Sequence, residues 1–314
     1  HVFNDVGWAA IRTAPEDRDK DIAFIFRSSP YGSISHSHAN NNDFILHVGG
    51  RAMAMPAGYY AGYASSHHGH YVWHTKSHNC VTLSDAPQLM RSPESTGAIV
   101  NAYEDDAITY MCGVADASYA DRAERCRRHV IYAKRAGSFL LVDEFAGKPG
   151  VLSSLQWNLH SWEPFAVEDR ERTFRWSRGE SAVTGVVMCH PEGFFSLSEG
   201  WDPPPMKWND EWRNQYHLRF TPTLLQHQAL DAESRAQHPS GFISLPRRNL
   251  GVVLQTQLPG QSVDPLERLL EEDGRETVSV GDTRFVVMPT GGAAGVVGEV
   301  SVGGAYYQFG DAGL

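Results

Sequence analysis

The chain has 314 residues, of which 41% are hydrophobic, and it carries a formal net charge of −10 with an isoelectric point near 5.8. This length can form one large core or two smaller ones. No run of eighteen apolar residues occurs, so no membrane span is predicted, and the acidic balance argues against nonspecific nucleic-acid binding, which needs a basic field.

The chain begins with HVFNDVGWAAIRTAP, which has neither an initiator methionine nor a signal-peptide pattern. We therefore expect the later part of something longer, or a processed product. Its four cysteines are widely spaced and form no CxxC pair. They could form two disulfides or remain four buried thiols, and the sequence leaves both open. These cysteines are Cys80, Cys112, Cys126 and Cys189.

Strand patterns dominate from the first hairpin onward. DFILHVGGRAMAM (43–55) predicts a hairpin around two glycines, and RRHVIYAKRAGSFLLVDEF (127–145) predicts two strands joined by KRAG. Helical periodicity is confined to Asp264–Gly274 and a short turn within 209–220, so we expect under about 15% helix. Because no βαβ alternation appears, the prediction is an all-β fold of antiparallel sandwich or stacked sheets.

Domain signals are weaker than strand signals. The proline-rich stretch GWDPPPMKWNDEW (200–212) is interpreted as a long surface loop, because strands of the same style continue on both sides. We predict a central β-sandwich domain over residues 1–225. Residues 226–314 are expected to form a C-terminal continuation or a small β domain.

Histidines gather early in the chain, with eight of the fifteen between His36 and His78. Seven of these eight lie in two stretches, SHSHANNNDF (35–44) and SSHHGHYVWHTKSHN (65–79). If the first stretch is extended, His36 and His38 share one face, because side chains in a strand alternate. Such a pair could bind a metal through both imidazoles. Alternatively, one histidine faces a cleft and the other binds a structural ion, with further ligands from a neighbouring strand.

GSISHSHANNNDFILHVGGRAMAMPAGYY followed by HTKSHNCVTL resembles the β-sandwich region of the heparinase II/III-like polysaccharide lyases, including oligoalginate and heparin lyases. The matching features are the HxH pair, the asparagine-rich step before Phe44, the glycine turn and the dipeptide His78-Asn79. The resemblance implies an (α/α) toroid upstream, which this sequence lacks. It also implies β-elimination on a uronic-acid polysaccharide such as alginate, heparin or heparan sulfate.

Site residues are carried over from this resemblance. His36 is expected to face the cleft and act on the uronate, with Tyr71 as a second catalytic residue or a packing aromatic. His38 and His78 are expected to bind a structural zinc ion, with His68 as the third ligand from the later cluster. Relatives place an aspartate ligand near a position where this chain has Pro56, so a replacement ligand is needed.

Substrate contacts are predicted from residue type and position. Arg51 could bind a sugar carboxylate, Tyr60 and Trp73 could stack on pyranose rings, and His160 could line the cleft or only cap a strand. Four arginines in Asp121–His129 could bind carboxylate or sulfate groups bidentately, or form a solvated strand face.

Two further classes of protein compete with the lyase. A carbohydrate-binding or structural β-sandwich module could keep the scaffold without activity. A metal-dependent cupin-like protein would need a glutamate soon after HxH, and HANNND has none. For the lyase we expect a periplasmic or secreted location, with a cytoplasmic one left open, and as partners an acidic polysaccharide and a helical toroid. We expect no nucleic acid or membrane.

Overall fold

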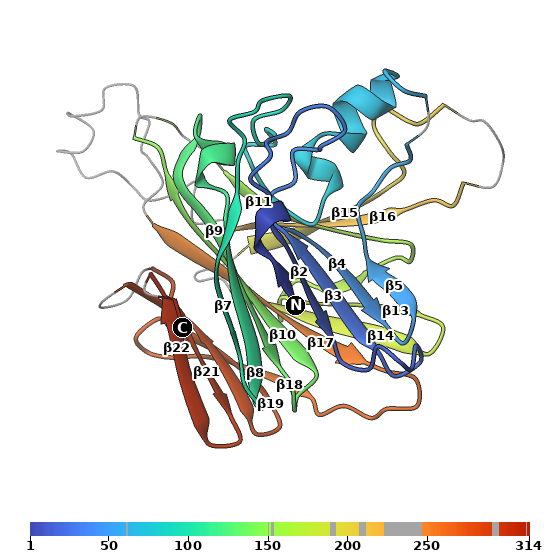
Figure 1. Cartoon of the computed structure of the whole chain (residues 1–314). Helices are drawn as coiled ribbons and strands as arrows, with labels where there is room; N and C mark the ends of the chain where they lie inside the picture. The colour runs from blue at the N-terminus through green and yellow to red at the C-terminus, as the bar shows by residue number, and fades with distance from the viewer. Residues whose placement is uncertain are drawn as a thin grey trace.

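The computed structural model describes residues 1–60, 62–149, 151, 154–188, 193–206, 212–222, 247–290, 295–311 and 313–314. Within these residues the chain folds into four antiparallel sheets (Figure 1). The helical elements are single turns, namely η1 (Asn4–Val6), η2 (His68–Val72), η3 (Thr75–Ser77) and η4 (Asp116–Tyr119). None of the described helices is long and apolar enough to cross a membrane. The predicted all-β fold is confirmed.

The first sheet is built from the N-terminal strands in chain order and ends in the predicted hairpin around Gly49 and Gly50. Both glycines have positive φ, at 56° and 68°, a backbone conformation that is strained for residues with a side chain. Its strands are β1 (Val2–Phe3), β2 (Trp8–Arg12), β3 (Ile22–Arg27), β4 (Asp43–Val48) and β5 (Arg51–Ala54).

The central sheet has eight strands in the order β12-β13-β14-β17-β10-β9-β8-β7. β9 and β10 form the hairpin predicted around KRAG, with Ala133 paired to Ser138. The strands are β7 (Ala98–Glu104), β8 (Ile108–Val114), β9 (Ala123–Ala133), β10 (Ser138–Gly147), β12 (Ala166–Glu168), β13 (Thr173–Arg178), β14 (Ser181–Met188) and β17 (Arg248–Gln257).

Two smaller sheets complete the fold. A four-stranded sheet has the order β15-β16-β11-β6, and a C-terminal sheet runs in chain order from β18 to β22. Their strands are β6 (Val81–Leu83), β11 (Leu155–Ser161), β15 (Gly193–Glu199), β16 (Tyr216–Pro222), β18 (Leu266–Leu270), β19 (Glu276–Val280), β20 (Thr283–Val287), β21 (Val296–Val302) and β22 (Ala305–Gly310).

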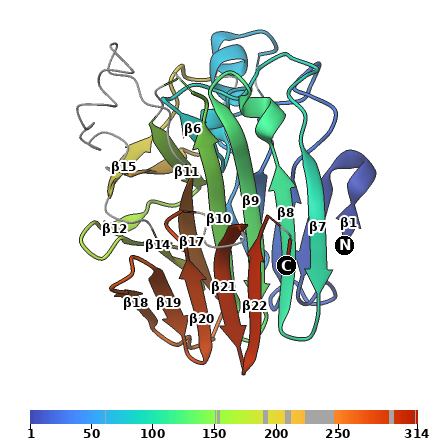
Figure 2. The same ribbon diagram turned by 90° about the vertical axis from the view of Figure 1, so that its left-hand side faces the viewer.

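The central sheet is buried on both faces, which explains the continuous apolar run in β10. Phe139 and Leu141 belong to the core shared with the first and four-stranded sheets, whereas Leu140 and Val142 belong to the core beneath the C-terminal sheet. Successive side chains in a strand point to opposite faces, so one strand feeds both cores. In Figure 2 the red C-terminal sheet lies in front of β10 and β17.

Two helix predictions are wrong. The segment predicted as a helix at 264–274 contains β18, which pairs with β19 from Leu266 opposite Val280 to Leu270 opposite Glu276. Periodicity cannot separate a short helix from an edge strand, and the open edge of β19 supplies the hydrogen bonds that decide this case. The predicted turn within 209–220 is the strand β16 from Tyr216 onward, and residues 207–211 lie outside the described residues.

The domain boundary predicted after residue 225 falls in 223–246, outside the described residues, and stays a prediction. The strand that follows it, β17, pairs with β10 and β14 in the middle of the central sheet. Cys80, Cys112 and Cys126 are buried free thiols, whereas Cys189 lies outside the described residues. For these three cysteines the thiol alternative is therefore the correct one.

Candidate functional site

A pocket of about 370 Å³ opens at the end of the first sheet where β3 and β4 are joined. The connection between these strands carries His36 and His38, so the HxH pair lies in a loop and not in a strand. His36 is exposed and His38 is half-buried. The pocket combines apolar and polar side chains, and its lining includes Trp8, Ile25, Arg27, His36, His38, Asn40, Asp43, Phe44, Pro56 and His78.

The two predicted ligands His38 and His78 meet in this pocket. His38 Nδ1 lies 3.2 Å from His78 Nε2, although the residues are 40 positions apart. Two nitrogens bound at 2.0–2.1 Å to a tetrahedral zinc ion lie about 3.3 Å apart, so the two imidazoles have suitable spacing for two ligands. Burial, and then the neighbouring His78, lower the pKa of His38 to about 3. His38 is therefore neutral at pH 7, as a metal ligand must be.

Asp43, the last residue of the HANNND step, orients His78. Its Oδ2 lies 2.9 Å from His78 Nδ1 and accepts a hydrogen bond from Asn40 Nδ2, while its Oδ1 accepts the backbone N–H of Asn79 at 2.9 Å. Burial alone would raise the pKa of Asp43, but His78 and these hydrogen bonds outweigh it and lower the pKa. A carboxylate that holds the second nitrogen of a ligating histidine is a common support for metal sites.

The predicted third ligand does not join this pair. Among the described residues no set of three or more histidine, cysteine or acidic side chains is arranged to hold an ion. His68 packs instead against Tyr60, Tyr63 and Trp73, with ring centroids 4.6, 5.1 and 4.8 Å away. Its Nδ1 accepts the N–H of Ala64 at 3.2 Å. The described residues therefore provide two suitable zinc ligands, His38 and His78, and the zinc ion stays a prediction.

We expect purified protein to bind about one zinc ion and His38→Ala to lose it, because that variant removes one of two facing imidazoles. Elemental analysis and the zinc-dependent shift in melting temperature measure this without an activity assay. His47→Ala is the control, since His47 lies toward the other end of β4 from Asp43. Wild-type protein without stoichiometric zinc, even after incubation with the ion, would exclude this prediction.

His36 lies beside Tyr60, which sequence reasoning assigned only to stacking. His36 Nδ1 is 3.1 Å from the Tyr60 hydroxyl, and the rings of Tyr60 and Tyr63 lie 6.5 and 6.4 Å from the imidazole. Trp73 packs against His68, which in turn contacts Tyr60 and Tyr63. The guanidinium carbon of Arg91 lies 4.7 Å from the centroid of the Trp73 ring. Tyr60 and Tyr63 are 54% and 69% exposed, so their faces are available to a ligand.

Arg27 is a pocket cation that sequence reasoning missed. Its guanidinium donates to the side-chain oxygens of Asn40 and Asn41, at 2.6 and 3.3 Å, and no described carboxylate lies within ion-pair distance. Arg51, the predicted sugar contact, lies elsewhere. It pairs with Val48 at the far end of β4 from Asp43, and five residues of strand span about 16 Å.

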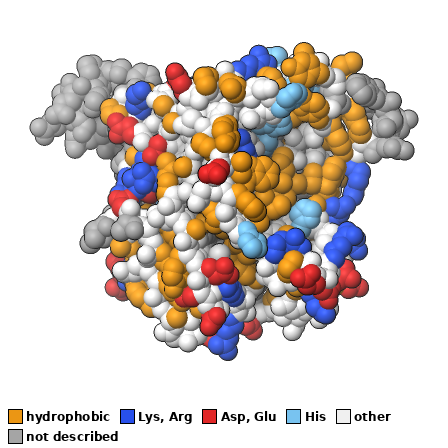
Figure 3. All heavy atoms as spheres, in the orientation of Figure 1, with side chains coloured by type: hydrophobic (Ala, Val, Ile, Leu, Met, Phe, Trp, Pro, Cys, Tyr) orange, Lys and Arg blue, Asp and Glu red, His pale blue; other side chains and the backbone are white. Residues whose placement is uncertain are grey.

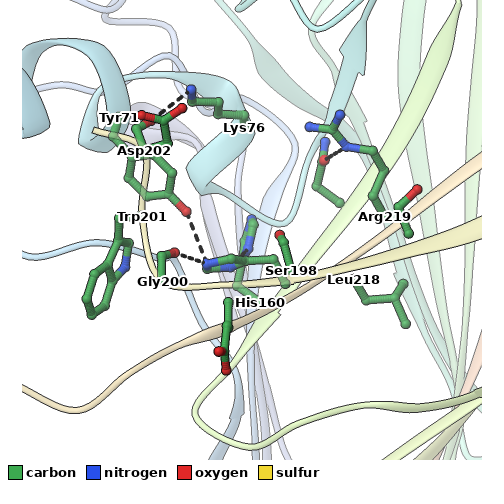
Figure 4. A pocket seen from close by; sticks show the side chains of 13 residues that line it. Tyr71, Lys76, His160, Ser198, Gly200, Trp201, Asp202, Leu218 and Arg219 are labelled. Carbon is green, nitrogen blue, oxygen red and sulfur yellow. Dashed lines mark hydrogen bonds between the residues drawn. The ribbon is translucent and has the colours of Figure 1, made fainter. Parts of the chain in front are cut away.

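Tyr71 and His160 are buried together, away from His36. Both line a second pocket, where the Tyr71 hydroxyl lies 3.5 Å from His217 Nε2 and His160 Nδ1 lies 2.8 Å from His217 Nδ1 (Figure 4). Burial raises the pKa of Tyr71. His160 Nε2 also lies 3.1 Å from the backbone oxygen of His78, so His160 helps to position the backbone of this candidate ligand.

The arginine-rich segment made of Arg122 and the start of β9 does not present four free cations. Arg125 and Arg127 pair with Glu144 and Asp116, and Arg122 lies 3.4 Å from the neighbouring Asp121. Arg128 is fully buried and bonds bidentately to Asp143. Arg128 therefore fits neither predicted alternative, because its buried guanidinium is bound to Asp143 and to backbone oxygens and is not presented to solvent or substrate.

The family of the chain follows from its sequence and fold together. The family model described as heparinase II/III-like, C-terminal, matches residues 1–220. The chain belongs to this family. Its structure is similar to heparan sulfate lyase HepC from Pedobacter heparinus, with a TM-score of 0.65 at 12% identity over 92% of this chain and 42% of that one. It is also similar to heparinase III, the BT4657 gene product, with a TM-score of 0.68 at 14% identity over 98% and 41%.

The chain matches only part of each solved structure. This heparinase II/III-like chain spans about 42% of the length of the solved structures it resembles. At such low identity the structural likeness shows the fold alone. The chain matches no curated protein sequence.

Proposed function

We propose that this chain is the β-sheet part of a polysaccharide lyase that cleaves uronic-acid polysaccharides by β-elimination. The observation that carries the proposal is the contact between exposed His36 and the Tyr60 hydroxyl at 3.1 Å, beside a pocket that also holds Arg27. Membership of the heparinase II/III-like family supports the class of reaction. The structural neighbours named heparan sulfate lyase and heparinase III favour a glycosaminoglycan over alginate.

The reaction removes the proton from the carbon next to the uronate carboxylate. The C–O bond to the neighbouring sugar then breaks, a carbon–carbon double bond forms, and the leaving oxygen takes a proton. That carbon acid is weak while the carboxylate keeps its full charge, so the carboxylate must be neutralised as charge develops. Arg27 is suited to this task, and the His36–Tyr60 pair is suited to moving the proton.

We propose that the remaining groups come from a helical toroid that docks on the first sheet. Hydrophobic side chains gather on the face of the molecule that carries β1–β5 (Figure 3). The exposed apolar residues of these strands, of their connections and of the segment that follows β5 include Phe3, Val6, Trp8, Tyr31, Ile34, Tyr60 and Tyr63. Contiguous apolar patches of this kind mark interaction surfaces. More than half of each structural neighbour lies outside the match, which leaves room for such a domain in a longer protein.

The test is an absorbance assay for unsaturated uronate product. It uses the full-length protein with heparan sulfate, heparin and alginate as separate substrates. We expect product from at least one glycosaminoglycan, and little or none from residues 1–314 alone. Full-length protein that binds these polymers without forming product would contradict the proposal and favour a carbohydrate-binding module.

A further inference from the structure

The second pocket, of about 450 Å³, lies between the four-stranded sheet and the η2–η3 segment (Figure 4). Its walls include Tyr71, Lys76, His160, Trp201, His217 and Arg219. Small-molecule sites span roughly 300–1,000 Å³, so this pocket is large enough for a ligand. His36 does not line it, and the proton-transfer pair proposed above lies outside it.

Trp201 joins this pocket to an aromatic cluster, defined as Tyr59, Trp162, Trp201 and Trp212. The Tyr59 ring lies 6.0, 5.4 and 5.1 Å from the rings of Trp162, Trp201 and Trp212. Trp201 Nε1 donates to Gln215 Oε1 at 2.7 Å, which fixes the indole, and all four residues are partly exposed. Two of these tryptophans come from the proline-rich stretch at 200–212, which the proposed function leaves without a role.

The pocket also offers cationic donors. Lys76 Nζ donates to the backbone oxygen of Asp202 at 3.2 Å, and no described carboxylate lies within ion-pair distance of it. An ammonium has three donor hydrogens, so Lys76 keeps capacity for a ligand. Arg219 is committed to Asp85 and Asn158. The carboxylates of Glu199 and Asp202 also line the pocket and can accept hydroxyl donors, although Glu199 already bonds Asn214 Nδ2.

We propose that this pocket and the aromatic cluster form a binding subsite for an acidic pyranose ring of the polysaccharide chain. The apolar C–H face of the sugar would pack on Trp201, its hydroxyls would bond the rim carboxylates, and its carboxylate would pair with Lys76. Stacking on a fixed indole and one charge-assisted hydrogen bond together give both affinity and preference for an acidic sugar. The acidic identity of the sugar rests on the proposed function, whereas the stacking platform does not.

Calorimetric titration of full-length protein tests the subsite. The probes are a non-sulfated hexasaccharide of alternating glucuronate and N-acetylglucosamine, the same hexasaccharide after carboxyl reduction, and an N-sulfated form. All proteins carry His36→Ala, so that the probe is consumed about 100-fold more slowly, or slower still, during the titration. Adding Trp201→Ala should weaken binding about tenfold or more, through lost stacking and buried apolar area. Trp201→Phe should stay within about threefold, because the ring remains.

The Lys76→Gln variant tests the contribution of the lysine charge separately from that of stacking on Trp201. It should weaken binding of the acidic hexasaccharide roughly tenfold and leave the carboxyl-reduced one unchanged, because only a charged partner is lost. Tighter binding of the N-sulfated probe that depends on Lys76 would assign the lysine to sulfate and overturn the carboxylate assignment. Equal binding by the Trp201→Ala and parent proteins would overturn the subsite. These measurements need no turnover, so a protein without lyase activity would contradict the proposed function and leave this test intact.

Discussion

Replacing His36 by alanine is expected to lower the turnover of the full-length protein by about 100-fold or more. The loss of one proton-transfer or charge-stabilising group has this scale. His36 is exposed at the pocket and reaches the Tyr60 hydroxyl at 3.1 Å, so its removal leaves the proposed proton path incomplete without opening a core cavity. The rate of unsaturated uronate formation at saturating substrate measures the effect, and the melting temperature checks the fold.

Two further variants are compared with His36→Ala. Arg51→Ala is a surface control at the far end of β4 and should keep near-wild-type turnover. His38→Ala should lower metal content and melting temperature first, with activity falling as a consequence. A His36→Ala protein that folds normally and turns over at the wild-type rate would show that His36 is structural.

Replacing Arg128 by methionine is expected to cost about 3–5 kcal/mol of unfolding free energy, the scale for breaking a buried ion pair by removing one partner. Arg128 Nε and NH2 each donate to Asp143 at 2.8 Å, and NH1 donates to the backbone oxygens of Asn42 and Asn79 at 2.7 and 2.6 Å. The variant leaves the Asp143 charge buried and removes the link between the loops on either side of the site. Urea denaturation followed by tryptophan fluorescence measures the loss.

Arg135→Met is the matched control for this measurement. Arg135 pairs with Asp282, but the two side chains are 70% and 46% exposed, and exposed pairs contribute about 0–1 kcal/mol. Adding Asp143→Leu to Arg128→Met should restore part of the lost stability, because the uncompensated charge is removed. Equal losses for the Arg128 and Arg135 variants would contradict the assigned role of Arg128.

The all-β class and its hairpins followed from the sequence because they depend on neighbouring residues. Gly49-Gly50 and KRAG carry their turn preferences locally, and an apolar run such as SFLLVDEF forms a strand buried on both faces wherever it pairs. The family motifs were also visible in the sequence, because each of them, the HxH pair and the dipeptide His78-Asn79, is a short local stretch of the chain. Helical periodicity alone gave the wrong prediction for 264–274, where pairing with the neighbouring strand β19 determines the structure.

The arrangement of the candidate site depended on contacts between distant residues. His38 reaches His78 and not His68 because the loop after β3 and the turn after η3 meet at Asp43, whose carboxylate is held by Asn40 and the Asn79 backbone. Arg128 became a buried anchor because β9 pairs with β10 in a register that brings it opposite Asp143. Side-chain type indicated which residues could do chemistry, but strand register and loop closure over dozens of residues decided which of them meet.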